Sequence, residues 1–221
     1  RHENAIAILN ADGSVREATT DVMDRPEFAA RKTTKTIDGT AITGWFVEDF
    51  TLAELKTLRA RERIPAIRPA NVAYNGQFEV PTLQEVIDLA KAQSAAKGRI
   101  IGIAPETKHP SFFQSIGMPL EPALLAVLTK NGWNSKDAPV YVQSFEVANL
   151  KALRKQSTVR LVQLLSNGGR PAQGNRHLRR CGGRTQGPGH PRERRCPGHP
   201  HHAGERRPRA EPGRAHLDTA A

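Results

Sequence analysis

Apolar patterns over residues 82–165 alternate between those of helices and those of strands, and this alternation constrains the fold more than any other feature. The order is helix, strand, helix, strand, helix, strand. The helical stretches repeat apolar residues every three or four positions, whereas the strands are short apolar runs. This order is typical of parallel strands joined by helical crossovers. It predicts an α/β fold and leaves open whether the sheet is open or closed into a barrel.

The ends of several elements can be read from the sequence. Thr51–Glu54 and Thr82–Glu85 are capping boxes, each of which begins a helix, and Gly98 is suited to end the second. A third helix is expected to end before Asn131-Gly132. The other predicted elements are strands over 100–105, 140–145 and 159–165 and a helix over 146–154.

The first fifty residues have a different character. Ala5–Leu9 and Val15–Thr20 flank the turn sequence Asn-Ala-Asp-Gly, which predicts a β-hairpin. Residues 21–50 show no strong helical period, and we expect a loop-rich insertion there rather than a core element. Within it, residues 37–42 predict a second turn between two extended pieces. Trp45 and Phe46 are expected to pack in the interior.

The stretch from Ile100 to Pro110 is predicted to be a short buried strand that ends in charge. Side chains alternate along a strand, so Gly102, Ala104, Glu106 and Lys108 would share one face. That arrangement suits a barrel strand with a site at its carboxyl end. A surface ion pair at the end of a strand explains the same residues equally well. His109 is expected to be a bystander before Pro110.

Residues 171–221 form a tail of distinct composition and carry most of the net charge of +11. The tail holds 11 arginines and 4 acidic residues, and it lacks Phe, Trp, Tyr, Ile, Val and Met. Such a segment has too little apolar surface to offset the entropy of ordering its backbone, so we predict that it is disordered. Both cysteines, Cys181 and Cys196, lie there, in a spacing that matches no common zinc finger.

Several separate blocks resemble the glycerophosphodiester phosphodiesterase family in its periplasmic bacterial form. They occur in the family's order and extend to about Leu165, so residues 1–170 are expected to be a fragment of that domain. The blocks are His2-Glu3-Asn4, Arg31-Lys32-Thr33-Thr34-Lys35, Gly44-Trp45-Phe46, Glu48 to Lys56, Phe78 to Val86, Pro105 to Pro110 and Gln143-Ser144-Phe145.

The resemblance implies a partial TIM barrel and the hydrolysis of glycerophosphodiesters to an alcohol and glycerol 3-phosphate. His2 aligns with the second catalytic histidine, and Glu106 aligns with the last metal-binding glutamate. Lys108 aligns with the lysine that faces the substrate phosphate, while Gln143 and Phe145 sit where the family lines its pocket. The implied cofactor is a divalent cation, Ca²⁺ or alternatively Mg²⁺. The implied location is the periplasm or the exterior of the cell.

These residue types suit the reaction. Negative charge grows on the phosphoryl oxygens as the ester bond breaks, and a cation together with Lys108 would stabilise it. A histidine such as His2 can supply a proton to the leaving alkoxide. Ca²⁺ prefers oxygen ligands, so a carboxylate such as that of Glu106 suits it better than the thiols and imidazoles of the tail.

The sequence also departs from the family. The blocks that carry the first histidine and the other metal carboxylates precede the position of His2 in the family and have no counterpart here. We therefore expect an internal piece of the enzyme, followed by an unrelated tail that a shifted reading frame would explain. The expected partner is a small glycerophosphodiester. The alternatives are an inactive fragment and non-specific nucleic-acid binding by the arginines of the tail.

Overall fold

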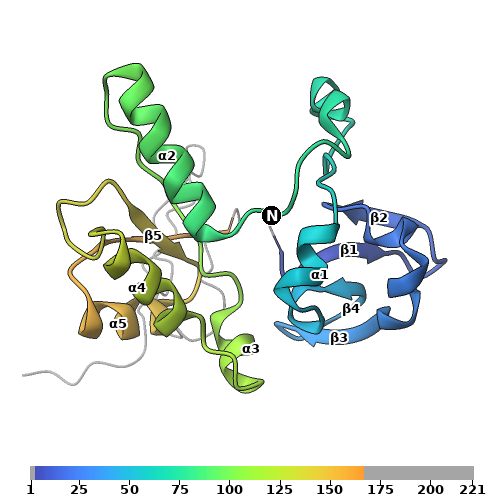
Figure 1. Cartoon of the computed structure of the whole chain (residues 1–221). Coiled ribbons are helices and arrows are strands. Elements are labelled where there is room, and N and C mark those ends of the chain that lie inside the picture. Colours follow the sequence, from blue (N-terminus) through green and yellow to red (C-terminus); the bar gives the residue numbers. More distant parts are fainter. Residues whose placement is uncertain (1–2, 167–221) are drawn as a thin grey trace, which may run out of the picture. The chain divides into compact units, whose positions relative to one another are not determined.

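Two sheets organise the residues that the computed structural model describes, which are 3–166 (Figure 1). An antiparallel sheet has the strand order β2-β1-β4-β3, and a parallel sheet pairs β5 with β6. The strands are β1 (Ala5–Leu9), β2 (Val15–Ala18), β3 (Thr33–Ile37), β4 (Thr40–Phe46), β5 (Tyr141–Ser144) and β6 (Arg160–Gln163). The helices are α1 (Leu52–Thr57), α2 (Leu83–Lys97), α3 (Pro110–Ser115), α4 (Leu120–Lys130) and α5 (Val147–Gln156), with 3₁₀ turns η1 (Val22–Asp24), η2 (Pro26–Arg31), η3 (Val47–Asp49) and η4 (Pro69–Tyr74). The structure is mixed α/β, with parallel pairing between β5 and β6, which confirms the predicted fold class at this coarser level.

The antiparallel sheet is built from two hairpins whose turns follow from the sequence. The predicted β1–β2 hairpin is confirmed, and its turn contains Gly13 at a φ of +83°. In the β3–β4 hairpin, Ile37 pairs with Thr40, so Asp38 and Gly39 form a two-residue turn. Both have positive φ, +49° and +79°, which matches the Asp-Gly preference of tight hairpin turns. The predicted turn over 37–42 is therefore confirmed.

The prediction that residues 21–50 lie outside the core is wrong. β4 lies between β1 and β3 in the sheet, and Trp45 and Phe46 are buried, as expected for packing residues. Val22 and Phe28 are also buried, against β1 and α1. The segment lacks a helical period because its apolar residues alternate along strands or sit in 3₁₀ turns, and those patterns were too short to indicate burial.

The parallel sheet is covered by helices. α2, α4 and α5 pack with β5 in one cluster of buried side chains, which includes Ile87, Leu128, Val142 and Leu153 (Figure 1). Both predicted capping boxes are present, at Thr51–Glu54 for α1 and Thr82–Glu85 for α2. α2 ends at Gly98 in the left-handed conformation, as predicted.

The predicted buried strand over 100–105 is instead a partly buried extended segment, in which Ile103 packs against the core cluster. Ile103 and Glu106 form isolated parallel bridges with Val140 and Gln143, and Ile100 is 80% exposed. The pairing is interrupted because Pro105 has no N–H to donate. The backbone bonds that remain are Ile103 N to Pro139 O, Tyr141 N to Ile103 O, Gln143 N to Pro105 O and Thr107 N to Gln143 O, all between 2.9 and 3.0 Å.

The partial TIM barrel stays a prediction. β5, α5 and β6 form one strand–helix–strand unit with parallel strands, which is the repeating unit of such a barrel. Between residues 3 and 166, no helix is both long and apolar enough to cross a membrane. The expected disorder of residues 171–221, and the nucleic-acid alternative that rests on their arginines, lie outside the described residues.

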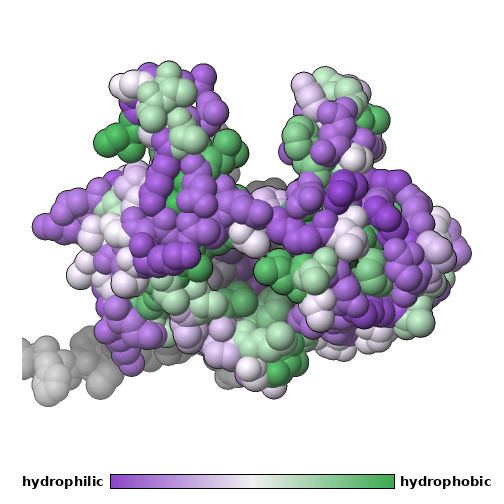
Figure 2. Space-filling model, in the orientation of Figure 1, coloured by the Kyte–Doolittle hydropathy of each residue, from purple (hydrophilic) through white to green (hydrophobic). Residues whose placement is uncertain are grey.

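A surface segment that contains η4 exposes several apolar side chains. Ile67, Val72, Tyr74 and Phe78 are between 42% and 76% exposed. Figure 2 shows apolar and polar side chains mingled over this segment, so the exposed apolar groups are interrupted by hydrophilic neighbours. Single exposed apolar residues are common on protein surfaces and require no partner.

Gly44 is a position where the sheet tolerates no side chain. A Cβ added there would lie 2.0 Å from the carbonyl oxygen of Ala7 on β1. We expect Gly44→Ala to destabilise the chain by roughly 2–3 kcal/mol, because the backbones of β1 and β4 must separate. Thr40→Ala, at the exposed start of the same strand, is the control, with an expected cost below about 1 kcal/mol. Urea unfolding measures both, and equal costs would contradict the prediction.

Candidate active site

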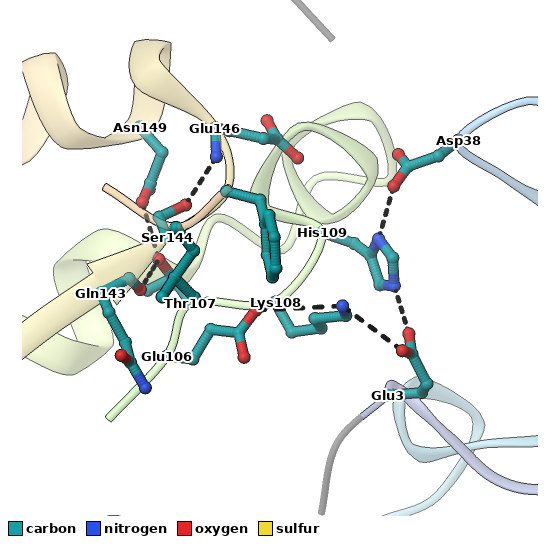
Figure 3. Close-up of polar contacts among 12 residues, drawn as sticks. Glu3, Asp38, Glu106, Thr107, Lys108, His109, Gln143, Ser144, Glu146 and Asn149 are labelled. Carbon is teal, nitrogen blue, oxygen red and sulfur yellow. Dashed lines mark hydrogen bonds and ion pairs between the residues drawn. The ribbon is translucent and has the colours of Figure 1, made fainter. Parts of the chain in front are cut away.

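Glu106 and Lys108 lie at the carboxyl end of the segment that pairs with β5 (Figure 3). Their side chains project to the same side, because side chains alternate along an extended chain. Lys108 Nζ is 3.9 Å from Glu106 Oε1, and the two side chains are 17% and 18% exposed. The prediction that both charges lie on the same side is confirmed, although they follow an extended segment and not a regular strand.

One oxygen of the Glu106 carboxylate is left without a hydrogen bond. Oε1 is buried and has no partner among the described residues, because 3.9 Å to Lys108 Nζ is too long for a hydrogen bond. A buried acceptor without a donor costs about 1–3 kcal/mol, and more when it is charged. Asp49 Oδ2 and Arg160 Nε are likewise buried without a partner in the described part of the chain, but Oε1 of Glu106 is the one that belongs to a residue lining a pocket with Lys108, where a cation or a ligand donor could complete it.

Lys108 is held from two sides. Its Nζ lies 3.3 Å from Glu3 Oε1 and 5.1 Å from the centre of the Phe145 ring. The ring face attracts the ammonium group, and the carboxylate neutralises part of its charge. Phe145, predicted to line the pocket, therefore contacts the residue predicted to face the phosphate.

His109 forms hydrogen bonds at both ring nitrogens (Figure 3). Nδ1 is 2.8 Å from Asp38 Oδ2, and Nε2 is 2.7 Å from Glu3 Oε2. The expectation that His109 is a bystander is wrong as regards structure. Its partners lie 71 and 106 positions away in the sequence, so no local pattern indicates these contacts.

Backbone strain is concentrated at the same contact. Asp38 and His109 are the two non-glycine residues with positive φ between residues 3 and 166, each at +49°. The left-handed conformation costs an L-residue roughly 1–2 kcal/mol. The hydrogen bond between these two strained residues helps to offset that cost, and strain of this kind is often found at functional sites.

The contacts of His109 shift two pKa values in opposite directions. Burial raises the pKa of Glu3, but the hydrogen bond with His109 and the charge of Lys108 outweigh it and lower that pKa to about 2. Burial lowers the pKa of His109, but its hydrogen bonds to Glu3 and Asp38 outweigh this effect, so the pKa lies above 6.5. The imidazolium form is therefore favoured between two carboxylates.

Glu146 adds a further carboxyl group. Its oxygens accept hydrogen bonds from Ser111 N at 3.2 and 3.3 Å and from Ser111 Oγ at 3.0 Å. Burial raises its pKa, against the opposing effect of those bonds. A pocket of about 150 Å³ is lined by Asp38, Glu106, Thr107, Lys108, His109, Pro110, Phe145 and Glu146.

Gln143 and His2 are the two remaining residues that were predicted to belong to the site. Gln143 donates from Nε2 to the carbonyl oxygen of Ala104 at 3.0 Å, so it braces the extended segment and does not line the 150 Å³ pocket. His2 lies outside the described residues. Sequence reasoning missed Glu3, Asp38 and Glu146 as site residues. The Asp-Gly turn and the acidic residue after His2 were visible, but nothing in the sequence indicates that they meet at His109.

The pair Glu3–His109 should make stability depend on pH at both ends of the range. The lowered pKa of Glu3 stabilises the fold above pH 4.5, and this contribution is lost as the pH falls towards 2. The raised pKa of His109 stabilises below pH 6.5, and this contribution is lost as the pH rises through the folded-state value.

Thermal midpoints between pH 3 and 9 should therefore be highest at about pH 4.5–6.5 for this pair. Asp38→Asn should move the loss of stability at high pH to lower values, because His109 loses one carboxylate partner. Asp137→Asn, at an exposed aspartate, is the control and should leave the profile unchanged. An Asp38→Asn profile that coincides with the control would contradict this account.

Comparison with known proteins identifies the family. The sequence pattern described as "Glycerophosphoryl diester phosphodiesterase family" matches residues 6–193, which extends beyond the last motif block near Leu165. This range covers most of the chain.

Three curated relatives have corresponding names. A glycerophosphodiester phosphodiesterase, GDPD6, of Arabidopsis thaliana is 38% identical over 60% of this chain and 37% of its own length. Glycerophosphodiester phosphodiesterases of Haemophilus influenzae and Treponema pallidum are 29% and 27% identical over 55% and 67% of this chain, and over 37% and 44% of their own lengths. The chain thus spans less than half the length of each of these three relatives. The extent of the family match shows that the chain belongs to the glycerophosphoryl diester phosphodiesterase family.

Proposed function

We propose that this chain carries part of an active site that hydrolyses glycerophosphodiesters to an alcohol and glycerol 3-phosphate. The observation that carries the proposal is the buried oxygen of Glu106, which lacks a donor and lies beside Lys108 in a pocket at the end of the extended segment that pairs with β5. In a member of this family, that arrangement suits a phosphodiester better than an isolated surface ion pair does. A periplasmic or secreted location belongs to the same proposal.

The charge of the pocket supports the need for a divalent cation. Its lining includes the carboxyl groups of Asp38, Glu106 and Glu146 but only two basic side chains, Lys108 and His109. His109 is already engaged by carboxylates at both nitrogens. A phosphodiester anion would therefore meet no net positive charge in this lining. A bound Ca²⁺ or Mg²⁺ would supply the missing positive charge and polarise the phosphoryl group.

The fit of the residues to such a cation is partial. Glu106 offers a buried carboxylate oxygen without another partner, which is the donor type that Ca²⁺ prefers. Among residues 3–166, however, no group of three or more His, Cys, Asp or Glu side chains is arranged to hold a metal ion. We therefore assign one ligand, Glu106, and propose that further oxygen ligands are required for tight binding, since Ca²⁺ takes six to eight.

Lys108 and His2 would take different parts in the reaction, one at the phosphoryl oxygens and the other in proton transfer. Lys108, fixed by Glu3 and Phe145, would contact a phosphoryl oxygen and stabilise the charge that develops there. Water would lose a proton as it forms the new bond to phosphorus, and the alcohol oxygen would gain one as its bond to phosphorus breaks. His2 would donate the proton to the alcohol oxygen, in the role that the family resemblance assigns, and it would also have to take up the proton that water loses. His109, with both nitrogens engaged, is unsuited to that role.

We expect the 221-residue chain to release glycerol 3-phosphate from glycerophosphocholine far more slowly than the relative from Haemophilus influenzae, with Ca²⁺ supplied to both. One carboxylate ligand cannot hold Ca²⁺ tightly, and one histidine must serve two proton transfers. Assays with and without a chelator measure the difference. Rapid, chelator-sensitive turnover by the chain itself would show that other residues carry the chemistry.

Substitutions at the two charged residues should have separable effects on the turnover that remains. Lys108→Ala should lower turnover by roughly 10²–10³-fold, the usual effect of removing one electrostatic stabiliser. Glu106→Gln preserves shape but removes charge, so it should raise the Ca²⁺ concentration needed for half-maximal activity. Lys136→Ala and Glu27→Gln, at exposed positions, are the matched controls. Wild-type turnover and Ca²⁺ dependence in the Lys108 and Glu106 variants would refute these roles.

A further inference from the structure

Glu121 carries a buried carboxyl group that contacts the site through other side chains. Glu121 of α4 is 4% exposed, and its hydrogen-bond partners among residues 3–166 are two neutral amide side chains. Its Oε1 accepts hydrogen bonds from Gln114 Nε2 and Asn149 Nδ2, both at 2.7 Å. Burying an unpaired carboxylate costs stability unless hydrogen bonds compensate, so its retention calls for a physical reason.

The carboxylate is the end of a chain of hydrogen bonds that reaches the site. Asn149 of α5 donates from Nδ2 to Glu121. Its Oδ1 accepts from Thr107 Oγ1 at 2.6 Å, and Figure 3 shows this second contact. Asn149 and Thr107 are 2% and 6% exposed, so water does not compete for these bonds. A carboxylate can only accept, which forces the Asn149 amide to turn its nitrogen to Glu121 and its oxygen to Thr107.

Thr107 lies between Glu106 and Lys108, and its orientation determines theirs. The bond to Asn149 holds the Thr107 side chain on the side that faces α5. Because side chains alternate along an extended chain, Glu106 and Lys108 then lie on the opposite side. Backbone pairing is interrupted here, since Pro105 donates no hydrogen bond, and beyond it the segment is paired through Gln143 N to Pro105 O and Thr107 N to Gln143 O. The side-chain anchor of Thr107 therefore compensates for the interrupted pairing.

We propose that Asn149 and Glu121 are positioning residues that act through Thr107 to orient Glu106 and Lys108. The inference rests on the proposed function for its consequence, which is the affinity of the site for a cation and a phosphate ester. The positioning itself has a readout that needs no ligand. Lys108 Nζ lies 5.1 Å from the centre of the Phe145 ring, so the ring current should shift the ε-methylene protons of Lys108 upfield.

The test compares variants of similar volume in the full chain. Thr107→Val removes the hydroxyl, Thr107→Ser restores it, and Asn149→Leu and Glu121→Met remove the two partners behind it. The matched control is Ser157→Ala, which removes another buried hydroxyl that is bonded to an asparagine, Asn134. Proton NMR measures the shift of Lys108. Calorimetry measures binding of Ca²⁺ alone and of glycerol 3-phosphate with Ca²⁺ present.

We expect the upfield shift to be largely lost in Thr107→Val, Asn149→Leu and Glu121→Met and kept in Thr107→Ser and Ser157→Ala. Both affinities should fall roughly tenfold in the three disruptive variants, as for other residues that orient ligands. A full upfield shift in Thr107→Val would overturn the proposal, as would an equal loss in Ser157→Ala. Binding of Ca²⁺ to the wild-type chain should be weak, because only one ligand is assigned, so the titrations extend to millimolar concentrations. If the wild-type chain binds neither probe in that range, the proposed function fails, while the NMR comparison still decides the positioning.

Discussion

The pairing of one extended segment with β5 is the interaction on which the site depends. It brings Glu106 beside Gln143 and sets the direction in which Lys108 leaves the sheet. Pro105 interrupts this pairing, so backbone hydrogen bonds do not fix the end of the segment by themselves. Buried side-chain bonds from Thr107 supply the missing restraint. The orientation of Glu106 and Lys108 is thus set both by backbone pairing with β5 and by the contact of Thr107 with Asn149 of α5.

Charges from distant parts of the sequence meet at this end of the segment. Glu3 precedes β1, Asp38 lies in the β3–β4 turn, and both reach His109. Contact with Glu3 also limits where Lys108 can move. Mutual neutralisation makes these partly buried charges tolerable, because each has an opposite charge within hydrogen-bond distance. The exception is Oε1 of Glu106, which is why that atom indicates a ligand.

Family membership and geometry support the same function from different directions. The family match concerns most of the sequence, whereas the geometry concerns a few side chains around Glu106 and Lys108. Motif blocks identified those two residues and Phe145 because their spacing within a block is local. Glu146 and Asp38 belong to no recognisable spacing, so only the folded chain reveals that they line the same pocket.

Local structure could be predicted from the sequence alone: the capping boxes of α1 and α2, the Asp-Gly turn and the placement of Glu106 and Lys108 on one side. Each depends on residues within a few positions of one another. Tertiary structure decided what depends on distant partners, including the burial of β4, the interrupted pairing at Pro105 and the bonds of His109. A strand's burial and a histidine's partners are set by what packs against them, and short-range sequence patterns carry no record of those neighbours.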